Sequence, residues 1–214
     1  MQKWKQIGCV ILSLLFMTAY SAKDGLDVES FADYQKEFKG EDVGVCSTSS
    51  VKTYEDYRAI TSPSSKQYWF IRENMSVDPS GLLVDKDGFF GVALGSYYGE
   101  IGDRFYFTLD TGIVLPVVKV DEKADQHVVN GCSHGSDGSV LEFVIHTDMA
   151  GEYFGRWGNG LILSGNFNNI EFFRGNIEKV EKVTDEKNEN YVTYEEKETP
   201  PFNNEDIFAY DSAY

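Results

Sequence analysis

Apolar residues in this chain form short runs divided by turn-forming residues, and no long stretch has the spacing of an amphipathic helix. Residues 89–95 and 140–147 are nearly continuous apolar runs, and residues 113–120 are apolar on both faces. Residues 104–109 alternate instead, with Phe105, Phe107 and Leu109 on one face. Runs of this length are typical of strands, and the two-faced run at 113–120 predicts a strand in the middle of a sheet.

Three further segments extend this β-rich pattern. Residues 67–72 have the aromatic and β-branched content of a strand, and residues 161–163 and 170–173 predict two more short strands. Residues 148–160 read as irregular. We therefore predict an all-β domain over residues 54–183. A linker with an optional short helix is expected over residues 23–53, and an acidic disordered tail over residues 184–214.

The first 22 residues have the pattern of a secretion signal. Lys3 and Lys5 precede a nearly uncharged apolar run at residues 7–20, and Ala19-Tyr20-Ser21 resembles a signal peptidase site. A retained membrane anchor is the alternative, although the run is short for a membrane span. We therefore expect residues 1–22 to be removed and the mature protein to lie in the secreted or cell-wall space, without a membrane contact.

The net charge limits the possible binding partners, and the cysteine content limits the possible disulfides. The chain has 19 Lys plus Arg against 35 Asp plus Glu, a net charge of −16. Such a surface repels phosphate backbones, so nucleic acid is excluded as a partner. Beyond the signal, only Cys46 and Cys132 remain; they either pair in an oxidising compartment or stay free.

Two segments carry the strongest candidate chemistry. The strand ending at Val120 breaks into acids and a histidine, beginning with Asp121, and the later strand at 141–146 holds Glu142 among apolar neighbours. Partial desolvation favours the protonated form of a carboxyl group, which is then able to donate a proton to a glycosidic oxygen. The alternative is that Glu142 faces solvent or pairs with Lys119 or Arg104.

Other reactive residues give weaker patterns. Cys132, His134, His127 and His146 lack a recognised zinc-ligand spacing, so we expect no metal and no other cofactor. A nucleophilic pair of Cys132 with His127 or His134 is a further alternative. A set of aromatic side chains either stacks on sugar rings or completes a small core. It consists of Tyr97, Tyr98, Tyr153, Phe154 and Trp157.

Four consecutive segments resemble the six-stranded double-psi β-barrel. They are Gly91-Val-Ala-Leu-Gly95, the predicted strand at 104–109, Asp110-Thr-Gly and Val117-Val-Lys-Val-Asp121. This barrel occurs in three-aspartate cell-wall domains, the lytic transglycosylase A group, the rare lipoprotein A group and expansins. The wider stretch from Tyr54 also resembles uncharacterised secreted or phage-encoded proteins of Firmicutes. The resemblance implies a barrel with extra N-terminal strands and loops, in which Asp121 and Glu142 match the two groove acids.

These observations lead to one expected function and one alternative. We expect a lytic-transglycosylase-like enzyme that cleaves peptidoglycan or another cell-wall polysaccharide, with Glu142 and Asp121 as catalytic residues. Substrate contacts are expected from Asp125, His127, His146, Tyr97 and Tyr98. The alternative is a non-catalytic module that binds polysaccharide or protein. The oligomeric state stays open.

Overall fold

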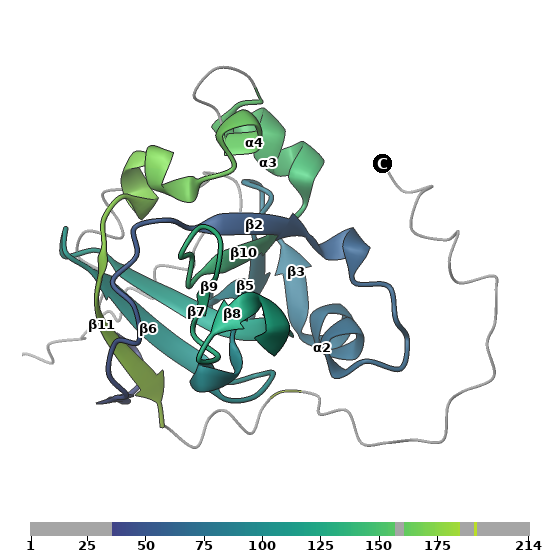
Figure 1. Ribbon diagram of the computed structural model, residues 1–214. Coiled ribbons are helices and arrows are strands. Elements are labelled where there is room, and N and C mark those ends of the chain that lie inside the picture. The colour runs from purple at the N-terminus through teal and green to yellow at the C-terminus, as the bar shows by residue number, and fades with distance from the viewer. Residues whose placement is uncertain (1–35, 157–160, 185–190, 192–214) are drawn as a thin grey trace, which may run out of the picture.

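The computed structural model describes residues 36–156, 161–184 and 191, and its centre is a mixed sheet of nine strands (Figure 1). Seven strands follow one hydrogen-bonded path in the order β1-β11-β6-β7-β5-β10-β2, while β3 pairs with β4 and β4 with β5. The strands are β1 (Gly40–Asp42), β2 (Thr53–Asp56), β3 (Met75–Val77), β4 (Leu83–Asp85), β5 (Phe90–Leu94), β6 (Arg104–Leu109), β7 (Val114–Glu122), β10 (Glu142–Ile145) and β11 (Ile177–Val183). A separate small hairpin joins β8 (Val128–Val129) to β9 (Ser133–His134).

Helices cover the sheet on different sides. Helix α3 (Thr147–Phe154) and the short α4 (Leu161–Ser164) lie at the top of Figure 1 above β2, and α2 (Lys66–Asn74) lies apart from them beside β3. Short 3₁₀ turns occur at Tyr57–Ala59, Ser96–Tyr98, Asp125–His127, Phe167–Asn169 and Glu171–Phe173. The described residues contain no helix long and apolar enough to cross a membrane.

The predicted all-β fold is wrong, and so is the six-stranded double-psi barrel. The strand path is open, running from β1 to β2 without closing, and the sheet mixes parallel with antiparallel pairs. Helices also account for segments read as strand or irregular chain. The domain is therefore mixed α/β. The prediction failed because a short apolar run fits a buried helical turn as well as it fits a strand.

Helix α2 shows why the local prediction failed. Residues 67–72 are rich in aromatic side chains, but the Ser65 side chain accepts a hydrogen bond from the Tyr68 N–H at 3.2 Å and caps a helix. Phe70 and Ile71 bury its inner side. The predicted strand at 161–163 is α4, the one at 170–173 contains a 3₁₀ turn, and the irregular 148–160 region contains most of α3.

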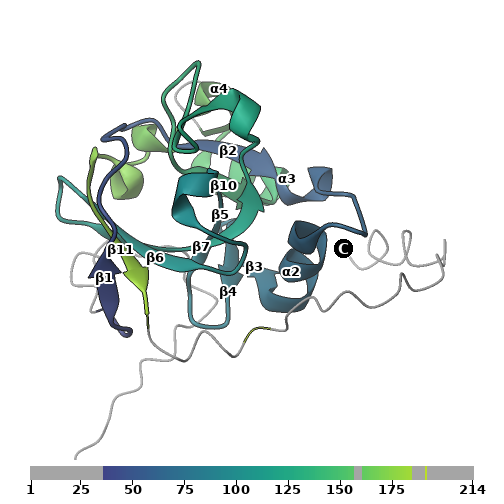
Figure 2. The ribbon, with the colours of Figure 1, turned by 60° about the horizontal axis from the view of Figure 1, so that its bottom comes forward.

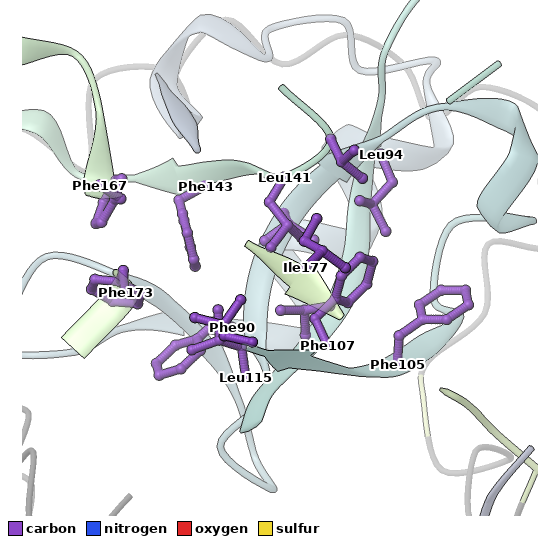
Figure 3. Close-up of a cluster of buried hydrophobic side chains, with 14 of the residues drawn as sticks. Phe90, Leu94, Phe105, Phe107, Leu115, Leu141, Phe143, Phe167, Phe173 and Ile177 are labelled. Atoms are coloured by element: carbon purple, nitrogen blue, oxygen red, sulfur yellow. The ribbon is translucent and has the colours of Figure 1, made fainter. Parts of the chain in front are cut away.

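Two apolar layers hold the sheet from both faces. Figure 3 shows the larger layer, in which Phe90 and Phe143 meet Phe167 and Phe173 from the turns that follow α4, while Phe107 packs against Phe105. A smaller layer on the other face joins α2 to the alternate residues of the same strands. All five residues of β5 are buried, so this strand belongs to both layers. Burial on both faces explains its unbroken apolar sequence.

The segment before β2 is attached at the sheet edge and through a disulfide. Strand β1 pairs antiparallel with β11 (Figure 2), and Cys46 is bonded to Cys132 with 6.0 Å between their Cα atoms. The pairing that the sequence left open is therefore formed. The predicted signal at 1–22 lies outside the described residues, as does the predicted tail apart from Thr184 and Tyr191.

Tyr191 closes a buried ionic cluster centred on Arg104. The Arg104 side chain is 1% exposed and its Nη2 lies 2.5 Å from Asp85 and 2.7 Å from Asp87. The Tyr191 hydroxyl accepts a bond from Arg104 Nε and donates to Asp85, while its ring packs edge-on to Phe70. A buried guanidinium needs such partners, because an ion without them is costly to remove from water.

We expect Tyr191→Phe to lower the free energy of unfolding by about 1–3 kcal/mol, because it removes a hydroxyl bonded to two buried charged groups. Urea denaturation measures the change. The exposed Tyr153 supplies the matched control, and Tyr153→Phe should leave stability within about 0.5 kcal/mol. Equal stability of the two variants would contradict a docked Tyr191.

Loss of the Cys46–Cys132 bond should destabilise the protein by about 2–5 kcal/mol, because the bond closes a long loop with a sequence separation of 86. Denaturation with and without a reductant tests this. The Cys46→Ala, Cys132→Ala double variant should match the reduced wild type and show no response to reductant. A wild type equally stable in both conditions would contradict the prediction.

Candidate functional site

A cleft of about 270 Å³ lies where β2, β10, β5 and the end of β7 meet. Most of its lining side chains are ionisable, and carboxyl groups dominate among them. The lining residues are Thr53, Glu55, Ala93, Asp121, Glu122, Lys123, Ala124, His127, His134, Asp137, Ser139 and Glu142.

Strand register brings the two acids predicted from the sequence together. Glu142 on β10 is paired with Thr53 on one side and with Ala93 of β5 on the other, and Ala93 is paired in turn with Asp121 of β7. Ala93 therefore lies between the two acids. Because its side chain is a single methyl group, the space between the two carboxyl groups stays open toward the cleft.

A bulge in β7 turns Asp121 toward the cleft. Val92 pairs with Lys119 but its neighbour Ala93 pairs with Asp121, so one extra residue, Val120, is accommodated in β7. Strict alternation from Val118 and Val120, which join the smaller apolar layer, would point Asp121 to the opposite face. An inserted residue changes the face on which the following side chain lies.

Glu55 is a further acid of the cleft, and its burial favours the protonated form of its carboxyl group. It is paired with Val144 on the parallel strand β10, on the face opposite Tyr54, whose ring packs against the larger apolar layer. Burial raises the pKa of Glu55 to about 9, and the charge of Asp121, a hydrogen bond with it and the charge of Glu142 add to the rise. Its Oε1 has no hydrogen-bond partner among the described residues. This oxygen is itself buried.

Lys123 supplies a buried positive charge beside these acids. Its side chain is 4% exposed, and its Nζ lies 3.8 Å from Glu142 Oε2. The same Nζ donates to the Ser139 hydroxyl at 3.1 Å and to the Ser139 carbonyl at 3.3 Å. Burial lowers the pKa of Lys123, while the negative charges of Glu142, Asp137 and Glu55 oppose this change.

The loop that carries the cleft's histidines is fixed by a close backbone approach. A Cβ atom on Gly95 would lie 2.0 Å from the Gly131 carbonyl oxygen, so only glycine fits at the end of β5. That carbonyl accepts a bond from the Tyr97 N–H at 3.0 Å, and Ser96 Oγ donates to Asp125 at 2.7 Å. These contacts hold the loop against β5, and His127 and His134 line the cleft from it.

Of the residues predicted from the sequence, Glu142, Asp121 and His127 line the cleft. The other four do not. Asp125 binds Ser96 instead, and His146 caps the start of α3 by accepting a bond from the Met149 N–H. Tyr98 is 2% exposed in the core, and the exposed Tyr97 donates through its hydroxyl to the Val43 carbonyl.

Sequence reasoning missed Glu55 and Lys123. Residues 53–56 form β2, in which Thr53 and Glu55 share one face. Alternation around Tyr54 was the available signal. Nothing in the sequence indicated that a lysine just past the end of β7 would be buried.

The alternative chemistries are restricted by the geometry. Cys132 is bonded to Cys46, so it is not a free thiol for a pair with His127 or His134. Within the described ranges, no three His, Cys, Asp or Glu side chains are arranged to hold a metal ion.

The raised pKa of Glu55 should make the free energy of unfolding depend on pH. Between its ordinary pKa of 4.5 and about 9, the folded protein holds a proton that the unfolded chain releases. Its contribution to stability is full below pH 4.5 and is lost as the pH rises toward 9. Glu55→Gln stays neutral, so it should raise the free energy of unfolding by about 1–3 kcal/mol at pH 8 and by less than about 1 kcal/mol at pH 5. Urea denaturation at both pH values measures this. The exposed Glu73→Gln should show no such pH-dependent gain, and neither should Glu55→Gln if its carboxyl is ionised at pH 8.

Comparison with protein-family models, with curated proteins and with solved structures finds no match for this chain.

Proposed function

We propose that the protein cleaves a glycosidic bond in a cell-wall polysaccharide, with peptidoglycan as the favoured substrate and Glu55 as general acid. The observation that carries the proposal is a cleft lined by Glu55, whose pKa burial raises, beside two further acids on neighbouring strands. Glycosidases commonly combine a protonated acid with an ionised one. The secretion signal expected at residues 1–22 would deliver such an enzyme to the cell wall.

Each step of the reaction has a candidate group in the cleft. The Glu55 carboxyl donates its proton to the glycosidic oxygen as the bond from this oxygen to the anomeric carbon breaks. Positive charge then develops on the sugar ring, and the negative charges of Asp121 and Glu142 stabilise it. Glu55, now a carboxylate, removes a proton from the attacking hydroxyl. If water attacks, the product is a hydrolysed sugar; if the sugar's own 6-hydroxyl attacks, it is an anhydro sugar.

This assignment differs from the sequence-based expectation in the identity of the acid. Glu142 was expected to donate the proton, but its Oε2 lies 3.8 Å from the ammonium group of Lys123. Glu55 is the group whose proton burial and neighbouring acids retain. Glu142 and Asp121 therefore take the role of stabilising charge.

A second candidate reaction is favoured by the hydrogen bond between Glu55 and Asp121. Two carboxyl groups that share one proton activate water in aspartic peptidases. The same pair here would hydrolyse an amide bond, for example in a peptide of the cell wall. The products distinguish the two reactions, because one releases sugar fragments and the other releases new amino termini.

The test is digestion of purified cell walls followed by mass spectrometry of the soluble products. Wild type should release sugar fragments, and Glu55→Gln should slow the release by about 10²–10⁴-fold, the usual contribution of a general acid. The exposed Glu73→Gln is the matched control and should cleave at the wild-type rate. Because the pKa of Glu55 is raised to about 9, the rate should fall at pH values above 9 as the acid loses its proton.

Other outcomes of this digestion have defined meanings. New amino termini without sugar fragments would contradict glycosidic cleavage and support amide hydrolysis by Glu55 and Asp121. Binding to walls without release of any product would contradict both and support a non-catalytic polysaccharide-binding module. Equal rates in wild type and Glu55→Gln would contradict Glu55 as the acid.

A further inference from the structure

Lys123 is the only lysine or arginine among the described residues that line the cleft. It lies just beyond β7, and its N–H continues the pairing with β5 by donating to the Leu94 carbonyl at 3.1 Å. This bond fixes the backbone from which the side chain extends. The residue is 6% exposed, so its ammonium group is screened from bulk water.

The contacts of the ammonium group are directed at one acid of the cleft. Two of its bonds go to Ser139, on the loop before β10, and these hold it 3.8 Å from Glu142 Oε2. By contrast, Lys123 forms no ion pair with Glu55, although both residues are described by the structure. The positive charge is therefore distributed unequally between Glu142 and Glu55.

We propose that Lys123 is a positioning residue whose buried ammonium group serves as the ionic partner of Glu142, so that Glu142 rather than Glu55 supplies stabilising negative charge in the cleft. The role of Lys123 in catalysis rests on the proposed function, but its electrostatic effect on Glu142 does not. A buried ammonium group stabilises the nearest carboxylate most strongly, because screening by solvent is weak there. Lys123 thus distinguishes the role of Glu55, the proton donor, from that of Glu142, which stabilises positive charge.

Charged and titratable groups from every element around the cleft act on this balance. They are Glu55 on β2, Asp121 and Glu122 on β7, Glu142 on β10, and His127, His134 and Asp137 on the intervening loop. Glu122 is paired with Lys119 at 2.5 Å, and Asp137 lies 3.6 Å from His134. Glu142 is the acid of this group whose carboxyl group lies 3.8 Å from the Lys123 ammonium group.

The test is a carbon-13 NMR titration of the glutamate carboxyl groups in the folded protein, with Glu55→Gln and Glu142→Gln used to assign the resonances. In Lys123→Met, the Glu142 titration should move to higher pH by about 1 pH unit or more than in wild type. Lys123→Arg, which retains the charge, should restore it toward the wild-type position. Lys66→Met removes an exposed lysine on α2 and should leave it unchanged. An unshifted Glu142 titration in folded Lys123→Met overturns the proposal.

A reciprocal measurement covers the case in which Lys123→Met does not fold. Coupling between two groups acts equally in both directions, so Glu142→Gln should move the titration of the Lys123 side chain to lower pH by a similar amount. This is followed through the lysine Cε resonances, and no shift there overturns the proposal as well.

Activity gives a separate readout. If wild type cleaves cell walls, the acid side of its pH–rate profile should move to higher pH in Lys123→Met together with the Glu142 titration. If wild type cleaves nothing, the proposed function fails while the NMR titrations still decide the role of Lys123.

Discussion

The placement of β5 between β7 and β10 is the constraint on which the rest of the structure depends. All five of its residues are buried, so the strand is held by apolar contacts on both faces and by hydrogen bonds on both edges. A strand in this position cannot shift by one residue without moving its side chains to the wrong layer. Because Ala93 is fixed in this way, the acids paired beside it are fixed too. The cleft is thus positioned by the most buried part of the sheet.

Gathering Glu55, Asp121 and Glu142 on neighbouring strands is costly in a protein whose net charge is −16. Two features offset the repulsion: Glu55 holds a proton, and the ammonium group of Lys123 lies beside Glu142. Neither favours folding by itself, since one retains a proton against its ordinary tendency and the other buries an ion. Buried ionisable groups that lower stability, such as these two in a cleft lying against the core, are typical of functional sites.

The sequence indicated part of this arrangement. The break after Val120 and the acid inside the later apolar strand predicted that Asp121 and Glu142 would meet, and strand register joins them through Ala93. Glu55 was missed because β2 pairs in parallel with a strand far away in the sequence, and such pairing leaves no local pattern. The bulge that turns Asp121 is also invisible, since it is a property of two strands together. The barrel was predicted from short apolar motifs, which fit the strands of an open mixed sheet equally well, and α2 was missed because its aromatic content outweighed the cap at Ser65.

The bond between Cys46 and Cys132 encloses a covalent ring of chain. The ring contains Glu55 and Asp121, whereas Glu142 lies outside it on the segment that follows Cys132. A single proteolytic cut anywhere between the two cysteines therefore leaves both pieces joined, and all three acids stay in one covalently linked molecule. The nicked protein would migrate as one chain in a denaturing gel until a reductant is added. A cut after Cys132, by contrast, would separate the chain at once into two fragments.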